Sequence, residues 1–439
     1  MVAPPSACLC NSSLFALHTQ RRATWVCPRV PKRPVRRTPE QSISRLLRKL
    51  PGSSTTFGPP RRFTAETPGW VEEWNSRSGN ARATCKIVHT PSNICRREPT
   101  TIYQPHTWQL RAWQQSCDKT SPHSESPATF FAAIPNARVF GADGCVIAPD
   151  DAVLGDVSVD INVVIDADAR SNRVFQRSKL PVVSLLRGKA ALLTSLGGHN
   201  YFHWMFHVLP RLVLMEQVGV DLAMIERFFV NEISAAFQVE TLKTLGIETD
   251  RVIESHSDTH VQVDCLLLPS RPSRMSEMPK WACEFLREKF LPSEAAAAGY
   301  PNARERLYIS RGKAAHRKVI NEAEIEAYLH SLGFESVLLE ALTVAEQAST
   351  LNSARVVVAP HGAGLTNLVF CRPDTIVIEM FSPSYINCCY WALSNWVGVQ
   401  YYFLLGSGGR DREDLFALGE DIVVEVDVLE EVLKLAGLV

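Results

Sequence analysis

From about residue 130 onward, the hydrophobic and polar positions alternate between two periodicities. Short runs of adjacent apolar residues, such as 356–358 and 376–378, are typical of strands buried on both faces of a parallel sheet. Between these runs, apolar residues recur every three or four positions, as on a helix with one buried face. The pattern therefore predicts an α/β protein with strands and helices in succession.

Two successive arrays of this kind are predicted. In the first, we expect strands at 138–147, 160–165, 190–195, 228–230 and 261–268, and helices at 201–218, 235–245 and 280–290. Pro210 should kink or break the helix at 201–218, because proline has no amide hydrogen to donate. In the second, strands are expected at 306–310, 336–339, 355–359 and 375–380, and helices at 322–332, 343–351, near Gly364 and at 386–397.

An Ala-rich stretch at 293–304 separates the two arrays and is the predicted interdomain connection. Two βα arrays joined in this way suggest two Rossmann-like domains that face each other across a cleft. We therefore expect three parts: an irregular extension at 1–126, a first Rossmann-like domain at 127–295, and a second at 296–439 that ends in a helix.

The extension differs from the remainder in composition. Of 27 prolines, 14 precede residue 125, and residues 1–65 contain 12 Lys and Arg but one acid, Glu40. The composition predicts mostly loop or disorder up to Ser126. Residues 1–50 have the Arg- and Ser-rich, acid-poor character of an organelle transit peptide. One alternative to a transit peptide is an unstructured extension, or an over-extended reading frame. Another is a basic arm, residues 1–65, that makes a peripheral contact with anionic lipid.

Composition also bears on the compartment and on partners. The chain has 12 cysteines but no CxxC pair, which favours free thiols in a reducing compartment over a zinc site. No apolar run approaches the roughly 20 residues that span a bilayer. We expect a cytoplasmic protein, with organelle or secretory targeting through the arm as the alternative. The body outside residues 1–65 has 34 bases and 45 acids, which argues against a nucleic-acid partner.

Three polar motifs follow predicted strands of the second array. The segment 359–367, which includes His361, Gly362, Ala363, Gly364 and Asn367, joins a buried strand to a helix, as phosphate-binding turns do. Arg311 and Arg317 lie near a strand end, where two guanidinium groups can neutralise a diphosphate, and Asn321 is placed to cap the next helix. Glu379 ends another strand, where a carboxylate can accept both ribose hydroxyls. Each motif also has a simple structural alternative. Segment 359–367 could be only a tight turn, the arginines with Asn321 a helix cap with solvated charges, and Glu379 a solvated acid.

A fourth motif lies in the first array. His203 and His207 are four positions apart on one predicted helix face, after the pair Gly197 and Gly198. This spacing can hold a metal, but a third ligand and the Glu of HExxH are missing. The alternatives are core histidines, or a site in which one histidine acts as a general base.

Taken together and in this order, the four motifs resemble glycosyltransferase family 61. The similarity covers about residues 130–405 and includes 199–204, 209–211, 308–311 with Arg317 and 321–322, 361–367, and 378–381. The resemblance implies a GT-B fold, inversion at the anomeric carbon, a nucleotide sugar (most often UDP-linked) as donor, and a glycan or polysaccharide as acceptor. It implies neither a cofactor nor an essential metal.

By the same resemblance, Arg311 and the 361–367 turn would hold the donor diphosphate and Glu379 the ribose. The helix of His203, with Asn200 and Trp204, would face the acceptor. The family commonly has an acid where this chain has His207, so the base is either His207, His203 or a residue elsewhere. A nucleotide-sugar epimerase or dehydrogenase is disfavoured because GxGxxG is missing. A degenerate member that only binds nucleotide or glycan is the remaining alternative.

Overall fold

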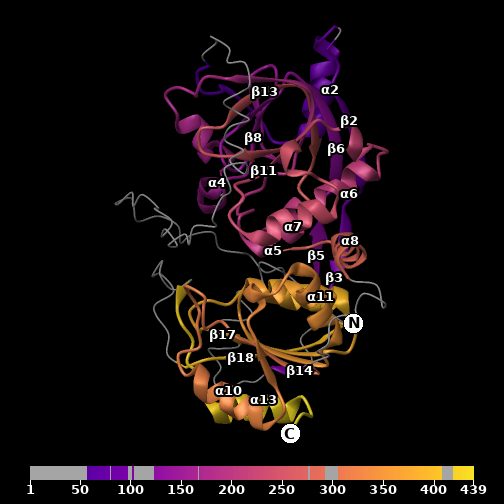
Figure 1. Cartoon of the computed structure of the whole chain (residues 1–439). Coiled ribbons are helices and arrows are strands. Elements are labelled where there is room, and N and C mark those ends of the chain that lie inside the picture. Colours follow the sequence, from indigo (N-terminus) through magenta and orange to yellow (C-terminus); the bar gives the residue numbers. More distant parts are fainter. Residues whose placement is uncertain are drawn as a thin grey trace, which may run out of the picture. The chain divides into compact units, whose positions relative to one another are not determined.

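The computed structural model describes residues 57–79, 81–96, 101–102, 123–166, 168–274, 277–291, 305–407 and 419–439. Within these ranges the chain is an α/β protein with one large mixed sheet, one smaller parallel sheet (Figure 1) and a separate pair of antiparallel strands. The predicted α/β class is confirmed. The predicted interdomain connection at 293–304 and the basic segment 1–50 lie outside the described residues.

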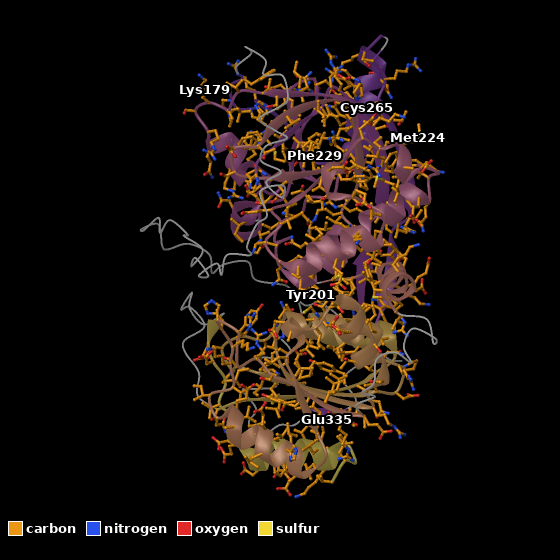
Figure 2. The ribbon with its side chains drawn as sticks, viewed as in Figure 1. Lys179, Tyr201, Met224, Phe229, Cys265 and Glu335 are labelled. Carbon is orange, nitrogen blue, oxygen red and sulfur yellow. The ribbon has the colours of Figure 1, made fainter. Side chains whose placement is uncertain are left out.

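The large sheet is built around four neighbouring parallel strands. Their order is β13 (His260–Pro269), β10 (Ser184–Leu192), β11 (Arg227–Asn231) and β12 (Val252–Ser255). β13 also pairs antiparallel with β6 (Thr129–Pro135) and β7 (Arg138–Phe140), beyond which lie β8 (Cys145–Ile147), β9 (Ala152–Leu154) and β1 (Arg62–Thr64). Alternate residues of each strand point to opposite faces: Phe228 and Val230 pack in one hydrophobic cluster. Phe229, which is labelled in Figure 2, packs in another.

Helices cover one face of this sheet in the order that the pattern predicted. They are α6 (Arg211–Glu216), α7 (Ala236–Thr244) and α8 (Lys280–Phe290), preceded by the short α5 (Tyr201–His203). The single helix expected at 201–218 is interrupted: a π-helical turn at Trp204–Val208 follows α5, and α6 begins after Pro210. The predicted break at proline is therefore confirmed.

The smaller sheet is parallel throughout, in the order β15 (Glu335–Val337), β14 (Arg306–Ile309), β16 (Val356–Pro360), β17 (Ile376–Phe381), β18 (Gln400–Leu405) and β4 (Thr101–Ile102). α10 (Glu322–Ser331) and α13 (Val426–Leu435) lie together on one face, and α11 (Val344–Ser353) lies on the other (Figure 1). A 3-10 helix at Ala363–Phe370 takes the place of the short helix expected near Gly364, and α12 (Cys389–Val397) begins three residues later than predicted.

Two local predictions are wrong. Residues 160–165 do not form a strand; α4 (Ile161–Asp166) begins there because Asp160 Oδ1 accepts hydrogen bonds from the amides of Asn162 and Val163, as a helix cap does. The strand expected at 138–147 is a hairpin of β7 and β8. Its turn contains Gly141 and Gly144 at φ of 76° and 72°, a region that favours glycine.

The prediction that residues 1–126 are mostly irregular is wrong for much of their described part. α2 (Thr67–Arg77) buries Trp70 and Val71 against the large sheet, and β2 (Thr84–His89) pairs with β6. β3 (Ser92–Cys95) pairs with β5 (His123–Ser126). The sequence pattern did not predict these elements because the segment is rich in proline and its buried apolar positions are few and widely spaced.

Seven described cysteines form no disulfide. Cys85 in β2 and Cys265 in β13 are half-buried, and the other five are buried. Burial raises the pKa of Cys145 to about 12, so its thiol stays protonated. In the described ranges, no helix has the length and apolarity needed to cross a bilayer, and no group of three metal-ligating side chains is found.

Candidate active site

The three motifs of the second array meet at the carboxyl edge of the smaller sheet. β14 runs into Ser310 and Arg311, and β16 ends at Pro360, directly before His361. Glu379 lies near the end of β17, the neighbouring parallel strand. Because parallel strands end at a common edge, residues that are far apart in sequence come together there.

His361, Glu379 and Tyr401 form a buried hydrogen-bonded chain. His361 Nδ1 lies 2.5 Å from Glu379 Oε1, and the Tyr401 hydroxyl donates to Glu379 Oε2 at 2.5 Å. Glu379 has no exposed surface, and both of its carboxylate oxygens are engaged. The predicted contact between Glu379 and a ribose therefore does not fit the structure; this carboxylate orients His361 instead.

Aromatic rings surround His361. Its ring stacks on Phe381 at a centroid distance of 5.1 Å and meets the rings of Tyr385 and Tyr390, each at 5.4 Å. Burial lowers the His361 pKa, against the opposing effect of Glu379, and the charges of Arg317 and Arg311 lower it further. The neutral ring then carries its proton on Nδ1, donates it to Glu379, and has Nε2 as an acceptor.

Arg311 packs directly against the glycine turn. A Cβ atom added at Gly362 would lie 1.9 Å from Arg311 Nη1, so only glycine lets the guanidinium lie there. Arg311 also donates from Nε to the Arg317 carbonyl at 3.1 Å and from Nη2 to the His316 carbonyl at 2.8 Å. These bonds fix both the guanidinium and the loop 312–317 beside the turn.

Arg317 lies at the same edge. Its guanidinium carbon is 5.1 Å from the centre of the Tyr385 ring, and its backbone has φ of 55°, in the left-handed region. The proximity of Arg317 lowers the pKa of Arg311, after burial as the larger cause. Two arginines held this close favour an anion between or beside them.

Two predicted donor residues have structural contacts instead. Asn321 lies at the start of α10, but its side chain exchanges hydrogen bonds with the backbone of Val424 at 2.8 and 3.1 Å and does not cap the helix. Asn367 is fully buried: its amide donates to Gln347 Oε1 at 2.8 Å, and its Oδ1 accepts from the Tyr201 hydroxyl at 2.9 Å. The cap predicted for Asn321 is therefore absent, and the side chain of Asn367 holds the helix after the turn in place.

Within the turn itself, Gly362, Ala363 and Gly364 lead into the 3-10 helix that begins at Ala363. An added Cβ at Gly364 would meet Leu339 Cδ1 at 3.3 Å, so this glycine allows close packing on the neighbouring segment. The glycine turn therefore packs on Arg311 through Gly362 and on Leu339 through Gly364, at the place where the sequence predicts a phosphate-binding turn.

The histidine helix has a different geometry. Asn200 caps α5, since its Oδ1 accepts from the Phe202 amide at 2.9 Å. His203 Nδ1 and His207 Nδ1 lie 2.9 Å apart, so one ring donates to the other. The π-helical turn that follows His203 and contains His207 is a feature often found at functional sites. An added Cβ at Gly197 would lie 2.8 Å from the His203 ring, which shows why a glycine precedes the helix.

Both histidines are held neutral. Burial is the main cause that lowers the His203 pKa to about 4, with smaller contributions from His199 and Arg271. Burial, His203 and Arg271 lower the His207 pKa well below its ordinary value. Trp204, predicted to face the acceptor, is instead fully buried and donates to Thr241 Oγ1 at 2.8 Å.

Sequence reasoning missed several residues of these two clusters. Tyr385, Tyr390 and Tyr401 surround or bind the His361–Glu379 pair, and Arg271 lies close enough to both histidines to lower their pKa values. Arg271 comes two residues after the end of β13, just as Arg311 comes two residues after the end of β14. An arginine directly after a buried strand could therefore have identified Arg271 as a site residue from the sequence.

Residues 201–378 match the family model described as Glycosyltransferase 61. The chain therefore carries a glycosyltransferase 61 domain over these residues, and the resemblance inferred from its motifs is confirmed. The matched segment includes His203, His207 and His361, and it ends one residue before Glu379.

Three relatives are β-1,2-xylosyltransferases. Two are from Oryza sativa subsp. japonica: XAX1, 32% identical over 26% of this chain and 18% of the relative, and RCN11, 37% identical over 16% and 13%. The third, from Arabidopsis thaliana, is 25% identical over 26% of this chain and 25% of the relative. The matched segments thus span a quarter or less of each relative.

Proposed function

We propose that the protein is an inverting glycosyltransferase that transfers a sugar from a nucleotide-linked donor to a glycan or polysaccharide. The observation that carries the proposal is the arrangement of Arg311, the Gly362 turn and the oriented His361 at one sheet edge. Guanidinium and backbone N–H groups at such an edge suit a diphosphate. The glycosyltransferase 61 match over the same residues supports the assignment.

The proposed architecture is GT-B, with the large sheet in an acceptor domain (127–295) and the smaller sheet in a donor domain (296–439). The two sheets, each with its own covering helices, support this division. Segments before residue 127 add strands to both: β1 and β2 to the large sheet and β4 to the smaller one.

In the proposed reaction, Arg311 and Arg317 stabilise the negative charge that develops on the departing diphosphate. His203, with its Nδ1 proton donated to His207, removes the proton of the acceptor hydroxyl through Nε2. The acceptor oxygen then bonds to the anomeric carbon as the bond to the diphosphate breaks. Bound anionic donor would raise the low pKa of His203, because nearby negative charge favours the imidazolium form.

The names of the relatives make UDP-xylose the first donor to test, with UDP, GDP, CMP and other UDP-sugars as comparisons. Thermal unfolding of the purified protein with each nucleotide, with and without EDTA, is the measurement. A ligand at a hundred times its Kd adds about 2.7 kcal/mol to the folded state. We expect a UDP-selective rise in Tm that survives EDTA; no rise with any nucleotide would contradict the proposal.

A further inference from the structure

A second positively charged centre lies at the carboxyl edge of the large sheet, beside the histidine pair. β13 ends at Pro269, shortly before Arg271, and the neighbouring parallel strand β10 ends at Leu192. Arg211 reaches the same edge from α6: it donates from Nη1 to the Leu192 carbonyl at 3.3 Å and from Nε to the His207 carbonyl at 3.1 Å. Two guanidinium groups therefore lie where these strands end, next to the π-helical turn.

No carboxylate balances this centre among the residues that the structure describes. The Arg271 side chain makes no hydrogen bond or ion pair with them, and burial lowers its pKa. Arg211 is 1% exposed, and burial and Arg271 lower its pKa to about 9. Glu277, later in the same loop, faces Arg96 instead, with Oε1 3.8 Å from Arg96 Nη2. A cation held away from water without a counter-ion costs free energy, and an anion bound beside Arg271 removes that cost.

Arg271 is accessible to a ligand. It is half-buried, as is His203, whereas His207 is buried. His199 and Asn200, in the turn before the histidine helix, are exposed, and His199 lies close enough to His203 to lower its pKa. The edge therefore presents a guanidinium group, the proposed base and exposed polar side chains to one ligand.

This centre is distinct from the arginine pair of the proposed donor site. Burial is the main cause that lowers the pKa of both His207 and His361, but different arginines add to it: Arg271 at His207, and the donor-site pair at His361. Aromatic rings link the two centres. The Phe202 ring lies 5.8 Å from both His207 and Tyr390, and Tyr390 lies 5.4 Å from His361. Since the proposed donor has a single diphosphate, which its own arginine pair neutralises, the second centre is available to the other substrate.

We propose that Arg271 binds a carboxylate or sulfate group of the acceptor, so that the acceptor is an acidic glycan. The proposal rests on the proposed glycosyltransferase function, because it names the class of acceptor for that reaction. A guanidinium group binds either oxyanion through two parallel N–H bonds, which fixes the orientation of the sugar that carries it.

Binding of this anion has two consequences for the reaction. The hydroxyl group to be glycosylated is held beside the half-buried His203. The anion also offsets the charge of Arg271, so the pKa of His203 rises from about 4 toward a value suited to a general base. An acidic acceptor therefore activates the base that deprotonates it.

The test measures binding of the full chain to an array of uronic-acid oligosaccharides, each beside its carboxyl-reduced form, and of sulfated oligosaccharides, each beside its desulfated form. The paired ligands separate charge from sugar identity, and the two sets distinguish carboxylate from sulfate. Arg271→Gln removes the cation, and Arg271→Lys keeps it without the planar guanidinium. Arg274→Gln, at an exposed position of the same loop, is the matched control. The UDP-induced rise in Tm reports the donor site separately.

We expect the unaltered chain to bind at least one charged oligosaccharide about tenfold or more tightly than its neutral form, as one charge-assisted hydrogen bond allows. Arg271→Gln should lose that preference, Arg271→Lys should keep part of it, and Arg274→Gln should match the unaltered chain. Without ligand, Tm of Arg271→Gln should be equal or higher, because an unneutralised cation is removed. The UDP-induced rise in Tm should be the same in all four proteins.

Equal affinity for charged and neutral forms throughout the array would overturn the inference, as would a preference for charged forms that survives Arg271→Gln. A lower Tm of Arg271→Gln without ligand would show that Arg271 is a structural support, and loss of its UDP response would assign Arg271 to the donor site; either result also overturns the inference. Absence of the UDP response from the unaltered chain would instead contradict the proposed function, and the glycan preferences would still decide the role of Arg271.

Discussion

His203 and His207 share a single proton between their facing Nδ1 atoms. A second proton at that contact would make one ring an imidazolium and place two N–H donors 2.9 Å apart in a buried position, which is unfavourable for both burial and hydrogen bonding. The arrangement therefore holds both rings neutral near pH 7. A neutral His207 can therefore accept the Nδ1 proton of His203.

This contact predicts a pH dependence of stability. The pKa of His203 is about 4 in the folded protein against 6.5 for an ordinary histidine, so protonation favours the unfolded chain. The contribution of His203 to stability is complete above pH 6.5 and is lost as the pH falls toward 4. We expect Tm to fall less over this range in His203→Gln than in the unaltered chain, measured by calorimetry. His330→Gln, on an exposed helix position, is the control, and equal slopes for all three would disprove the account.

At the scale of the element, the turn after β16 depends on the absence of a side chain at one position. Gly362 has φ of 174°, extended backbone that any residue adopts, so its need for glycine comes from space and not from conformation. That space is occupied by the Arg311 guanidinium. The turn and the strand-end arginine are therefore one unit for anion binding.

Gly362→Ala should weaken nucleotide binding with little effect on folding. The added methyl group displaces the flexible end of Arg311, and loss of one charge-assisted hydrogen bond, about 1.5–3 kcal/mol, corresponds to roughly tenfold or more in affinity. Isothermal titration with UDP measures the loss, and Tm without nucleotide should stay near the original. Gly364→Ala, whose methyl group would meet only Leu339 Cδ1 at 3.3 Å and Ile309 at 3.6 Å, should bind UDP almost normally. Equal affinities for both variants would show that Arg311 is not a binding group.

At the scale of the whole molecule, elements that the structure describes before residue 127, among them α2 and β2, pack on the large sheet. Trp70 of α2 is 2% exposed, donates from its indole nitrogen to Asp150 Oδ1 at 3.1 Å, and stacks on Trp74 at 5.6 Å. The large sheet thus has α2 on one face and α6, α7 and α8 on the other.

Trp70→Ala is expected to lower the free energy of unfolding by about 3–5 kcal/mol, the usual cost of removing a buried tryptophan. Denaturant unfolding followed by circular dichroism measures the change. Trp74→Ala, at a half-buried position of the same helix, should cost clearly less. The same small effect for both substitutions would contradict this account, because it would mean that α2 contributes little to the stability of the large sheet.

The parts of this protein that could be predicted from its sequence are those with local causes. The apolar runs of β16 and β17, the helical periods of α7 and α8, and the break at Pro210 follow from neighbouring residues alone. So do the motifs that identify the family, because arginine, glycine and histidine near strand ends are visible in the sequence.

Only the tertiary structure decided which of these side chains meet. Glu379 reads as a strand-end acid, yet its two oxygens are taken by His361 and Tyr401, which lie 18 and 22 positions away. Asn367 and Trp204 read as site residues, yet both are buried with partners elsewhere in the chain. Strand order and sheet register set these contacts, and they depend on pairing between distant segments, for which a single sequence contains no local signal.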